Sequence, residues 1–309
     1  THILQTLEKN EFLVPTDINT WQVMKTLTTL DHLHDSIEHM LEQGRLIFPT
    51  YLAEFNMIER SGKELHNVLQ GKVNGLQILF PNGSMDNTEA LYERSALSEA
   101  YNNQVCLFFE KVMSSISDNS RYRQKILEIG AGTGGLTSHV LETISPINLS
   151  QNSKDLRTAT VHEYVFTDVS KLFLSYARQK FSACSYMKYQ LLDIEKSPST
   201  QGFKKHYYDF VLAANVLHAT MNLNETLRNI KELLKPGGIL VILEVTKPTL
   251  FLDLTFGLLD GWWRFSQHGK QDLRDSYPLL SWSDWSLLLT EAGFANVNRI
   301  SSQISATHA

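Results

Sequence analysis

The segment Ile126-Leu-Glu-Ile-Gly-Ala-Gly-Thr-Gly-Gly-Leu136 decides the fold of this 309-residue chain. Its apolar start, ending at Gly130, predicts a buried strand, and residues 136–144 are typical of a helix. The glycines between them predict a tight turn that a ligand can approach closely. A strand, a glycine-rich turn and a helix form the first unit of many open parallel sheets. We therefore predict an α/β core with a ligand at this turn.

Outward from this segment, short apolar runs alternate with helical stretches towards the C-terminus. The alternation predicts a mostly parallel sheet wrapped by helices. A helix at residues 284–292 is expected to begin behind the capping residues Ser281 and Ser283 and to end at Gly293. Strands are predicted at residues 125–129, 162–166, 187–191, 209–213, 239–243 and 297–300, and the final strand is expected to be incomplete or to be completed by residues 304–309.

The N-terminal part of the chain has a different pattern. From residue 18 to about residue 110, apolar residues such as Trp21 and Met24 recur three and four positions apart, which is the helical period. Phe80-Pro-Asn-Gly-Ser84 interrupts this pattern with turn-forming residues. We predict a mainly helical lid subdomain at residues 1–115 and a cofactor-binding core at residues 116–309.

Composition narrows the class of function. A formal charge of -5 and an isoelectric point near 6.1 offer no basic field for nucleic acid. The sequence has no apolar run of the ~20 residues that a membrane span needs, and no charged-then-apolar leader. Cys106 and Cys184 are far apart and outside any metal-ligand spacing, so we expect reduced thiols and no metal. These features predict a cytoplasmic protein without a nucleic-acid or membrane partner.

The glycine turn alone leaves two kinds of cofactor open, because Gly130, Gly132 and Gly135 also satisfy the dinucleotide fingerprint G-x-G-x-x-G. Glu128 lies two residues before the first glycine. A carboxylate there can receive the cationic amino group of an amino-acid moiety, whereas it would repel a pyrophosphate. Asp168 ends the second predicted strand, where an acid typically binds ribose hydroxyls. Charge therefore favours a cofactor that carries an amino acid.

Two further motifs identify the family of the core. Tyr189-Gln-Leu-Leu-Asp193 places a third acid at a strand end, and Leu234-Lys-Pro-Gly-Gly leads into the strand before Glu244. With these motifs, residues 124–300 resemble the class I S-adenosylmethionine methyltransferases. The resemblance implies a Rossmann-like, mostly parallel sheet of about seven strands, with S-adenosylmethionine as cofactor and S-adenosylhomocysteine as product. It implies these cofactor-binding residues: Glu128, Gly130, Gly132, Gly134, Asp168 and Asp193, which would hold the adenine amino group. We assign Asn215 to the cofactor as well, and the alternative is that it donates to a developing enolate oxygen. Nicotinamide-dependent hydride transfer is the alternative, although no feature of the chain selects nicotinamide.

A histidine and a glutamate are candidates for acid–base chemistry. His218 follows the fourth predicted strand of the core, and Glu244 closes the fifth. Neighbouring strands lie about 4.8 Å apart, so the two side chains are expected to converge at the edge where such sheets bind ligands. A histidine with a carboxylate partner is a general base with a fixed tautomer. The alternatives are a histidine in the pocket wall and a solvated strand-end acid.

The amino-acid sequence around these residues indicates a substrate class. Asn215-Val-Leu-His-Ala-Thr220, the paired Trp262 and Trp263, and Tyr277-Pro-Leu-Leu-Ser281 resemble the C-methyltransferase domains of modular polyketide synthases and of hybrid polyketide/peptide synthases. The resemblance implies methyl transfer to the α-carbon of a β-ketoacyl thioester on an acyl carrier protein, with His218 as general base and Glu244 orienting it. Neighbouring domains of a multidomain synthase would be further partners. Candidates for the substrate pocket are Tyr92, Trp262, Trp263, Phe265 and Tyr277.

Two alternatives remain beside carbon methylation. An O-methyltransferase on the same scaffold also benefits from a base near the cofactor. A catalytically silent methyltransferase-like domain could serve as a spacer in a synthase, although its usual signature, a damaged glycine turn or a lost base, is absent from this sequence.

Overall fold

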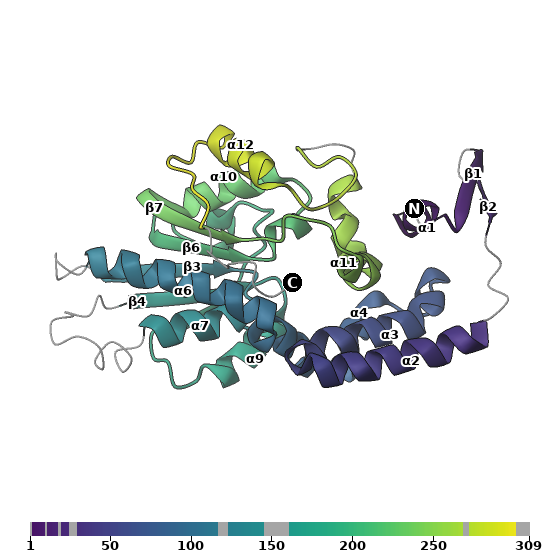
Figure 1. Cartoon of the computed structure of the whole chain (residues 1–309). Helices are drawn as coiled ribbons and strands as arrows, with labels where there is room; N and C mark the ends of the chain where they lie inside the picture. The colour runs from purple at the N-terminus through teal and green to yellow at the C-terminus, as the bar shows by residue number, and fades with distance from the viewer. Residues whose placement is uncertain are drawn as a thin grey trace.

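The computed structural model describes residues 2–9, 11–17, 20–24, 30–116, 123–144, 161–267 and 272–300. Its centre is a five-stranded parallel sheet in the order β5-β4-β3-β6-β7 (Figure 1). The strands are β3 (Gln124–Ile129), β4 (Val161–Asp168), β5 (Met187–Leu191), β6 (Tyr208–Ala214) and β7 (Leu234–Leu243). The strand order reverses beside β3, and such a switch point opens a ligand-binding crevice at the carboxyl ends of the strands.

Helices cover both faces of the sheet, because successive residues of a strand point to opposite sides. Leu127 and Ile129 pack in one apolar cluster with α10 (Leu223–Leu233) and α12 (Trp282–Glu291). Ile126 belongs to the cluster on the other face, which is completed by α6 (Ala96–Ile116), α7 (Gly135–Ile144) and α9 (Lys171–Lys180). Burial on both faces explains why these strands read as continuous apolar runs.

The α/β fold class is confirmed, with two corrections in the core. The described residues form five strands of this sheet, fewer than the seven expected. Residues 297–300 form no strand and pair with none of the described strands, and Val297 packs on the core. The predicted completion of a final strand in residues 304–309 lies outside the described part of the chain.

Turn-forming and capping residues determine the boundaries of β7 and α12. β7 begins at Leu234, five residues before the predicted start, and residues 235–238 bulge out between the pairs Tyr208↔Leu234 and Phe210↔Ile239. Helix α12 begins behind Ser281, whose hydroxyl accepts from the Asp284 N–H at 3.2 Å. It stops before Gly293, whose φ of 81° is the left-handed value expected there.

The N-terminal part is mainly helical but contains a two-stranded hairpin after its first helix. The helices are α1 (His2–Lys9), α2 (Leu30–Ile47), α3 (Leu52–Leu69), α4 (Gly75–Leu79) and α5 (Asp86–Glu89), followed by the π-helical turn η3 (Ala90–Arg94). A hairpin of β1 (Leu13–Asp17) and β2 (Thr20–Val23) corrects the prediction of helix from residue 18. Trp21 pairs with Pro15, and aromatic and β-branched residues favour strands, so an apolar spacing over so few residues was misleading.

The lid, defined here as residues 30–94, contacts the core at the glycine turn. Lys180 of α9 forms ion pairs with Glu89 and Glu93 at 2.6 and 2.5 Å. A Cβ on Gly135 would lie 2.6 Å from the Tyr92 carbonyl oxygen, so the absence of a side chain permits this approach. Further along the chain, α6 packs on the sheet, with the rings of Phe109 and Phe210 5.1 Å apart. The domain boundary at residue 115 stays a prediction.

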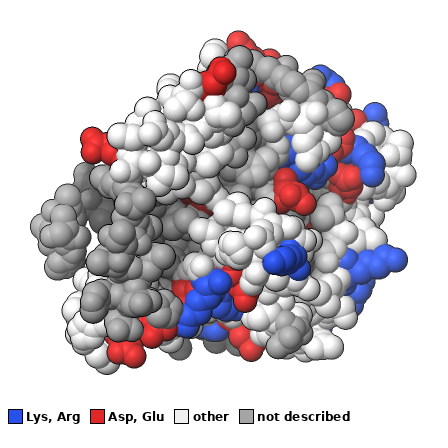
Figure 2. Space-filling view, turned by 90° about the vertical axis from the view of Figure 1, so that its right-hand side faces the viewer, with Lys and Arg blue, Asp and Glu red and all other residues white. Residues whose placement is uncertain are grey.

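The surface carries no large field of one charge sign on the face shown in Figure 2, where Lys and Arg are interspersed with Asp and Glu. Within the described residues, no helix is both long and apolar enough to cross a membrane.

Candidate active site

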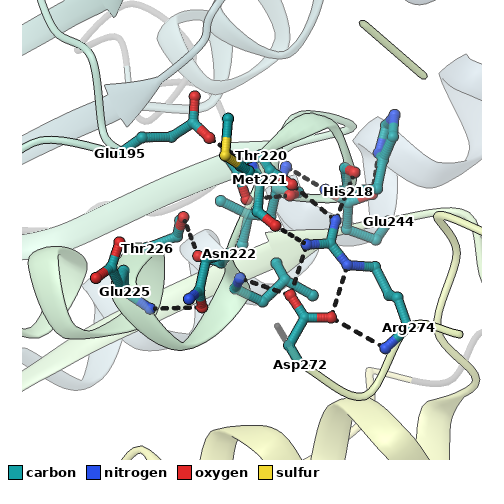
Figure 3. Close-up of polar contacts among 12 residues, drawn as sticks. Glu195, His218, Thr220, Met221, Asn222, Glu225, Thr226, Glu244, Asp272 and Arg274 are labelled. Atoms are coloured by element: carbon teal, nitrogen blue, oxygen red, sulfur yellow. Dashed lines mark hydrogen bonds and ion pairs between the residues drawn. The ribbon is translucent and has the colours of Figure 1, made fainter. Parts of the chain in front are cut away.

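His218 and Glu244 meet at the carboxyl ends of two neighbouring strands. β6 and β7 run in parallel, with Ala214 opposite Leu243. Glu244 directly follows β7, and His218 lies in a single 3-10 turn, η6 (Leu217–Ala219). His218 Nδ1 and Glu244 Oε2 are 2.6 Å apart, and only 11% and 2% of the respective side chains are exposed. The structure thus brings together the two side chains that the strand order predicted to converge (Figure 3).

Glu244 also holds the backbone on which His218 lies. Its second oxygen, Oε1, accepts from the N–H groups of Val216, Leu217 and His218 at 3.0, 2.7 and 3.4 Å. An anion at the start of a helical turn is stabilised by such free N–H groups. Because a carboxylate has only acceptors, Nδ1 of His218 carries the shared proton, which leaves the lone pair of the neutral ring on Nε2. The arrangement therefore presents a basic nitrogen on the far side of the imidazole.

Trp262, from the segment after β7, lies against the imidazole and is itself packed by other aromatic side chains. The Trp262 ring lies 4.9 Å from the His218 ring, edge-on at 64°. Phe256 stacks on Trp262 at 6.0 Å, and Tyr277 lies edge-on to Trp262 and Trp263 at 6.2 and 5.9 Å. These side chains form an apolar wall, and three of them are among the residues predicted for the substrate pocket.

The other pocket candidates have contacts of their own. Phe265 is buried, and the Arg274 guanidinium lies 5.2 Å from its ring. Tyr92 lies in η3 of the lid, 6.2 Å from Phe256 between ring centroids. Burial and the negative charge of Glu244 raise the pKa of the Tyr92 hydroxyl well above its ordinary value, so the phenol stays protonated. The lid therefore contributes a buried, protonated hydroxyl group at Tyr92. The substrate roles of all five candidates stay predictions.

The glycine turn after β3 touches the His218 loop. Gly130, Gly132 and Gly134 have φ values of 57°, 56° and 76°, a left-handed region that other residues enter only with strain. A Cβ on Gly130 would lie 2.3 Å from Val216 Cγ2. Since Val216 immediately precedes the η6 turn, the predicted cofactor turn contacts the loop that carries the candidate base.

Glu128 is a buried acid beneath the glycine turn. Only 1% of the residue is exposed, and its Oε2 accepts from the hydroxyls of Thr137 and Tyr164 at 2.6 and 2.5 Å. Burial raises the pKa of this carboxyl to about 7, although the two hydroxyl donors oppose the rise. No basic side chain in the described ranges forms an ion pair with it. Glu128 is thus an acid that a bound cation would ionise.

Asp168 joins the end of β4 to the glycine turn. Its Oδ2 accepts from the Gly132 N–H at 3.1 Å, and its Oδ1 accepts from the Ser170 N–H at 2.8 Å. Burial nevertheless raises the pKa of Asp168 above its usual value. Its carboxylate is therefore fixed beside the turn, where the sequence predicted ribose binding.

Asp193 and Asn215 complete the predicted cofactor set. Asp193 forms an ion pair with Lys196 at 2.8 Å, and this lysine side chain is 73% exposed. Asn215 has an unusual φ of 50°, and its N–H donates to the Leu243 carbonyl at 2.7 Å. Such strained residues cluster at ligand sites, but the binding roles of both residues stay predictions.

These residues fit a cofactor with a cationic amino group. The buried carboxyl of Glu128 lacks a cation among the described residues, and Gly132, at a left-handed φ of 56°, has only the Gly130 carbonyl oxygen, at 3.9 Å, within 4 Å of where a Cβ would lie. Asp168 stands at the end of the adjoining strand. No group of His, Cys, Asp and Glu in the part of the chain described here could hold a metal ion.

Sequence reasoning missed Arg274 and Asp272. Arg274 is 2% exposed, and its guanidinium donates to the carbonyls of His218 and Thr220, both at 2.9 Å (Figure 3). The only signal in the sequence was a pair of opposite charges two positions apart, close to the aromatic segment after β7. Two such charged residues are usually exposed to solvent on the surface.

Comparison with known proteins agrees with this geometry. Residues 127–240 match the family described as a methyltransferase domain. Over 247 residues, which are 79% of this chain, the sequence is 36% identical to the polyketide synthase ThaG of Burkholderia thailandensis. The chain spans only 4% of the length of that relative.

Two solved structures resemble the chain over nearly its whole length. The CurJ carbon methyltransferase is 38% identical, with a TM-score of 0.78, and the match covers 95% of this chain and 72% of that one. The DszA carbon methyltransferase is 33% identical, with a TM-score of 0.83, and the match covers 98% and 74%.

Proposed function

Because the chain belongs to the S-adenosylmethionine-dependent carbon methyltransferase domains of polyketide synthases, we propose that it methylates the α-carbon of a β-ketoacyl thioester. The observation that carries this proposal is the 2.6 Å contact between His218 and Glu244, next to the glycine turn. That contact supports a base of fixed tautomer close to the cofactor.

His218 is the proposed general base. The α-hydrogen of a β-ketoacyl thioester lies between two carbonyl groups, so its loss leaves a delocalised enolate. Nε2 of His218 takes this proton, and the electron pair of the broken C–H bond passes into the enolate. Glu244 stabilises the imidazolium that results and keeps the ring in place. Groups of this kind contribute about 10²–10⁴-fold to a rate.

The cofactor is held, in this proposal, by the residues around β3, β4 and β5. Glu128 receives the amino group, Asp168 the ribose hydroxyls and Asp193 the adenine amino group, while Gly130, Gly132, Gly134 and Asn215 line the turn and the adjacent loop. When bound, S-adenosylmethionine supplies the electrophilic methyl group that the enolate carbon accepts, leaving S-adenosylhomocysteine.

The aromatic wall positions the acyl chain and excludes water. Trp262, Trp263 and Tyr277 lie on one side, and Tyr92 reaches in from the lid with a protonated hydroxyl. Because an enolate and a methyl donor need alignment more than further chemistry, positioning in a water-poor chamber contributes much of the rate.

The thioester is proposed to arrive on the phosphopantetheine arm of an acyl carrier protein, next to other domains of a synthase. The size of ThaG supports this, since this chain matches only 4% of it.

The test is to incubate the chain with S-adenosylmethionine and an acetoacetyl group on a carrier protein, and then to locate any added methyl by mass spectrometry and NMR. A methyl on the α-carbon is expected. The matched control is the 2,2-dimethylacetoacetyl thioester, which has no α-hydrogen and should gain nothing. A methyl on oxygen would indicate an O-methyltransferase, and binding of S-adenosylhomocysteine without any transfer would indicate a silent domain.

A further inference from the structure

The Arg274 guanidinium is buried beneath the loop that carries His218. All five of its N–H groups have acceptors, which is the full capacity of an arginine. The acceptors are the carbonyls of His218 and Thr220 at 2.9 Å, the Met221 carbonyl at 3.1 Å, and the two Asp272 oxygens at 2.9 and 2.6 Å. Figure 3 shows the guanidinium pointing into this loop, with Asp272 beside it.

The loop is held by opposite charges at its two ends. At the start of η6, Glu244 accepts from the N–H groups of residues 216–218. Past its end, Arg274 donates to the carbonyls of residues 218, 220 and 221. Anions stabilise the start of a helical turn and cations its end, so both charges have the favourable sign. His218 is the residue that both side chains hold through its backbone.

Asp272 fixes the arginine and extends the hold to the next helix. Its Oδ2 also accepts from the N–H of Leu223, the first residue of α10, at 2.8 Å. Burial alone would raise the pKa of Asp272, but the hydrogen bonds from Arg274 and from the backbone keep it below the usual range. The pair therefore stays charged, and it joins the His218 loop to α10.

A buried ion pair is a poor device for stability alone, because desolvation offsets most of its attraction. Charged hydrogen bonds to backbone carbonyls are, however, strong and directional. Lysine offers a single charge without the planar fork, so it cannot reach three carbonyls and a carboxylate in the same geometry. The contacts therefore point to accurate placement of the loop.

We propose that Arg274, supported by Asp272, is a positioning residue that holds the His218 loop so that the imidazole faces the substrate in register with Glu244. The inference rests on the proposed function, in which His218 is the base. It adds a third charged side chain to the pair, acting only through the backbone.

The test compares Arg274→Lys and Asp272→Asn with Arg45→Lys, a matched control at the Arg45–Glu59 ion pair of the lid. Rates of methyl transfer to acetoacetyl-pantetheine are normalised to the sites that bind S-adenosylhomocysteine, so that unfolded material does not count. We expect kcat to fall about tenfold in Arg274→Lys and less in Asp272→Asn, since small misplacement of a reacting group is costly. The KM, the cofactor Kd and the control should change by less than about twofold.

A second readout follows His218 itself. The Nδ1 proton shared with Glu244 should give a downfield NMR signal, assigned by its absence in His218→Ala, and Arg274→Lys should broaden or shift it. An unchanged signal with unchanged kcat would overturn the positioning role, and so would a parallel loss of cofactor binding, signal and melting temperature. If His218→Ala stayed active, the proposed base would fail, whereas the signal would still report whether Arg274 orders the ring.

Discussion

Glu128, near the carboxyl end of β3, and Glu244, directly after β7, are two buried glutamates with different hydrogen-bond partners. Glu244 is saturated by its own chain, since its oxygens accept from three backbone N–H groups and from the His218 ring. Glu128 has two hydroxyl donors and no cation among the described residues, and its pKa is raised to about 7. The folded chain itself supplies the partners of Glu244, whereas Glu128 lacks a cationic partner among the described residues.

The difference indicates that Glu244 has its partners with or without a ligand, whereas Glu128 gains a cationic partner only when a ligand binds. A carboxylate whose lone pairs are all used keeps a fixed geometry, which suits the orientation of a base. A buried carboxylate without a cation is costly when ionised, and a ligand that brings the cation recovers that cost. The difference supports the proposed roles, Glu244 as the orienting partner of the base and Glu128 as a cofactor ligand, and we expect the two to respond differently to the same substitution.

Of the two glutamates, Glu244 is expected to show the larger effect on substitution. In Glu244→Gln the side-chain amide can no longer accept from every donor around it, so the imidazole loses its fixed tautomer. We predict that kcat falls about a hundredfold or more while the Kd of S-adenosylhomocysteine changes little. Steady-state kinetics and calorimetry measure the two quantities. Glu163→Gln is the matched control, a buried glutamate on β4 that is paired with Lys188.

A smaller, pH-dependent effect is expected at Glu128. The Glu128 carboxyl must be ionised to receive the amino group of the cofactor. As pH rises towards 7, cofactor affinity should therefore increase about tenfold per pH unit, and above pH 7 it should level off. The opposite sign applies to the free protein. The folded state binds this proton more tightly than the unfolded state, whose pKa is near 4.5, so the free energy of unfolding should decrease as pH rises from 4.5 through 7.

Glu128→Gln tests both slopes. The variant should bind S-adenosylhomocysteine more weakly, and the part of each slope due to Glu128 should vanish in titrations between pH 5 and 8. The Asp168 carboxyl, whose pKa burial also raises, interacts with Glu128 and raises the pKa of that group, so the same comparison is made in an Asp168→Asn background to isolate Glu128. Identical slopes in the two proteins would remove Glu128 from the cofactor site.

The smallest effect is expected at Lys196, which pairs with Asp193 on the surface. An exposed ion pair contributes little, so Lys196→Ala should change cofactor affinity by less than about twofold. Asp193→Ala should lower it about tenfold through the loss of a hydrogen bond to the adenine. Equal effects of the two substitutions in the same calorimetric assay would show that the ion pair, rather than the free carboxylate, matters.

The sequence predicted what depends on the order of strands. His218 and Glu244 are 26 residues apart, yet a parallel sheet places the ends of β6 and β7 together, and the observed contact follows. The helix at residues 284–292 was predictable because its cap and its terminal glycine act locally. Both predictions used rules that need no knowledge of loop paths.

The features that the sequence did not predict depend on the paths of loops and on the pairing of strands. Arg274 reaches carbonyls 53 to 56 residues earlier in the chain, and backbone carbonyls leave no mark in a sequence. Trp21 follows helical spacing but lies in a strand because a hairpin partner, β1, is present. Residues 297–300 have the apolar pattern of a strand but pair with none of the described strands.

The most direct measurement of the central claim is a double-mutant cycle on kcat with His218→Ala, Glu244→Gln and the combined variant. If the two residues act as one unit, His218→Ala loses about a thousandfold, and adding Glu244→Gln costs nothing further. If the losses multiply instead, the two side chains act independently, and Glu244 does not serve His218 as its orienting partner.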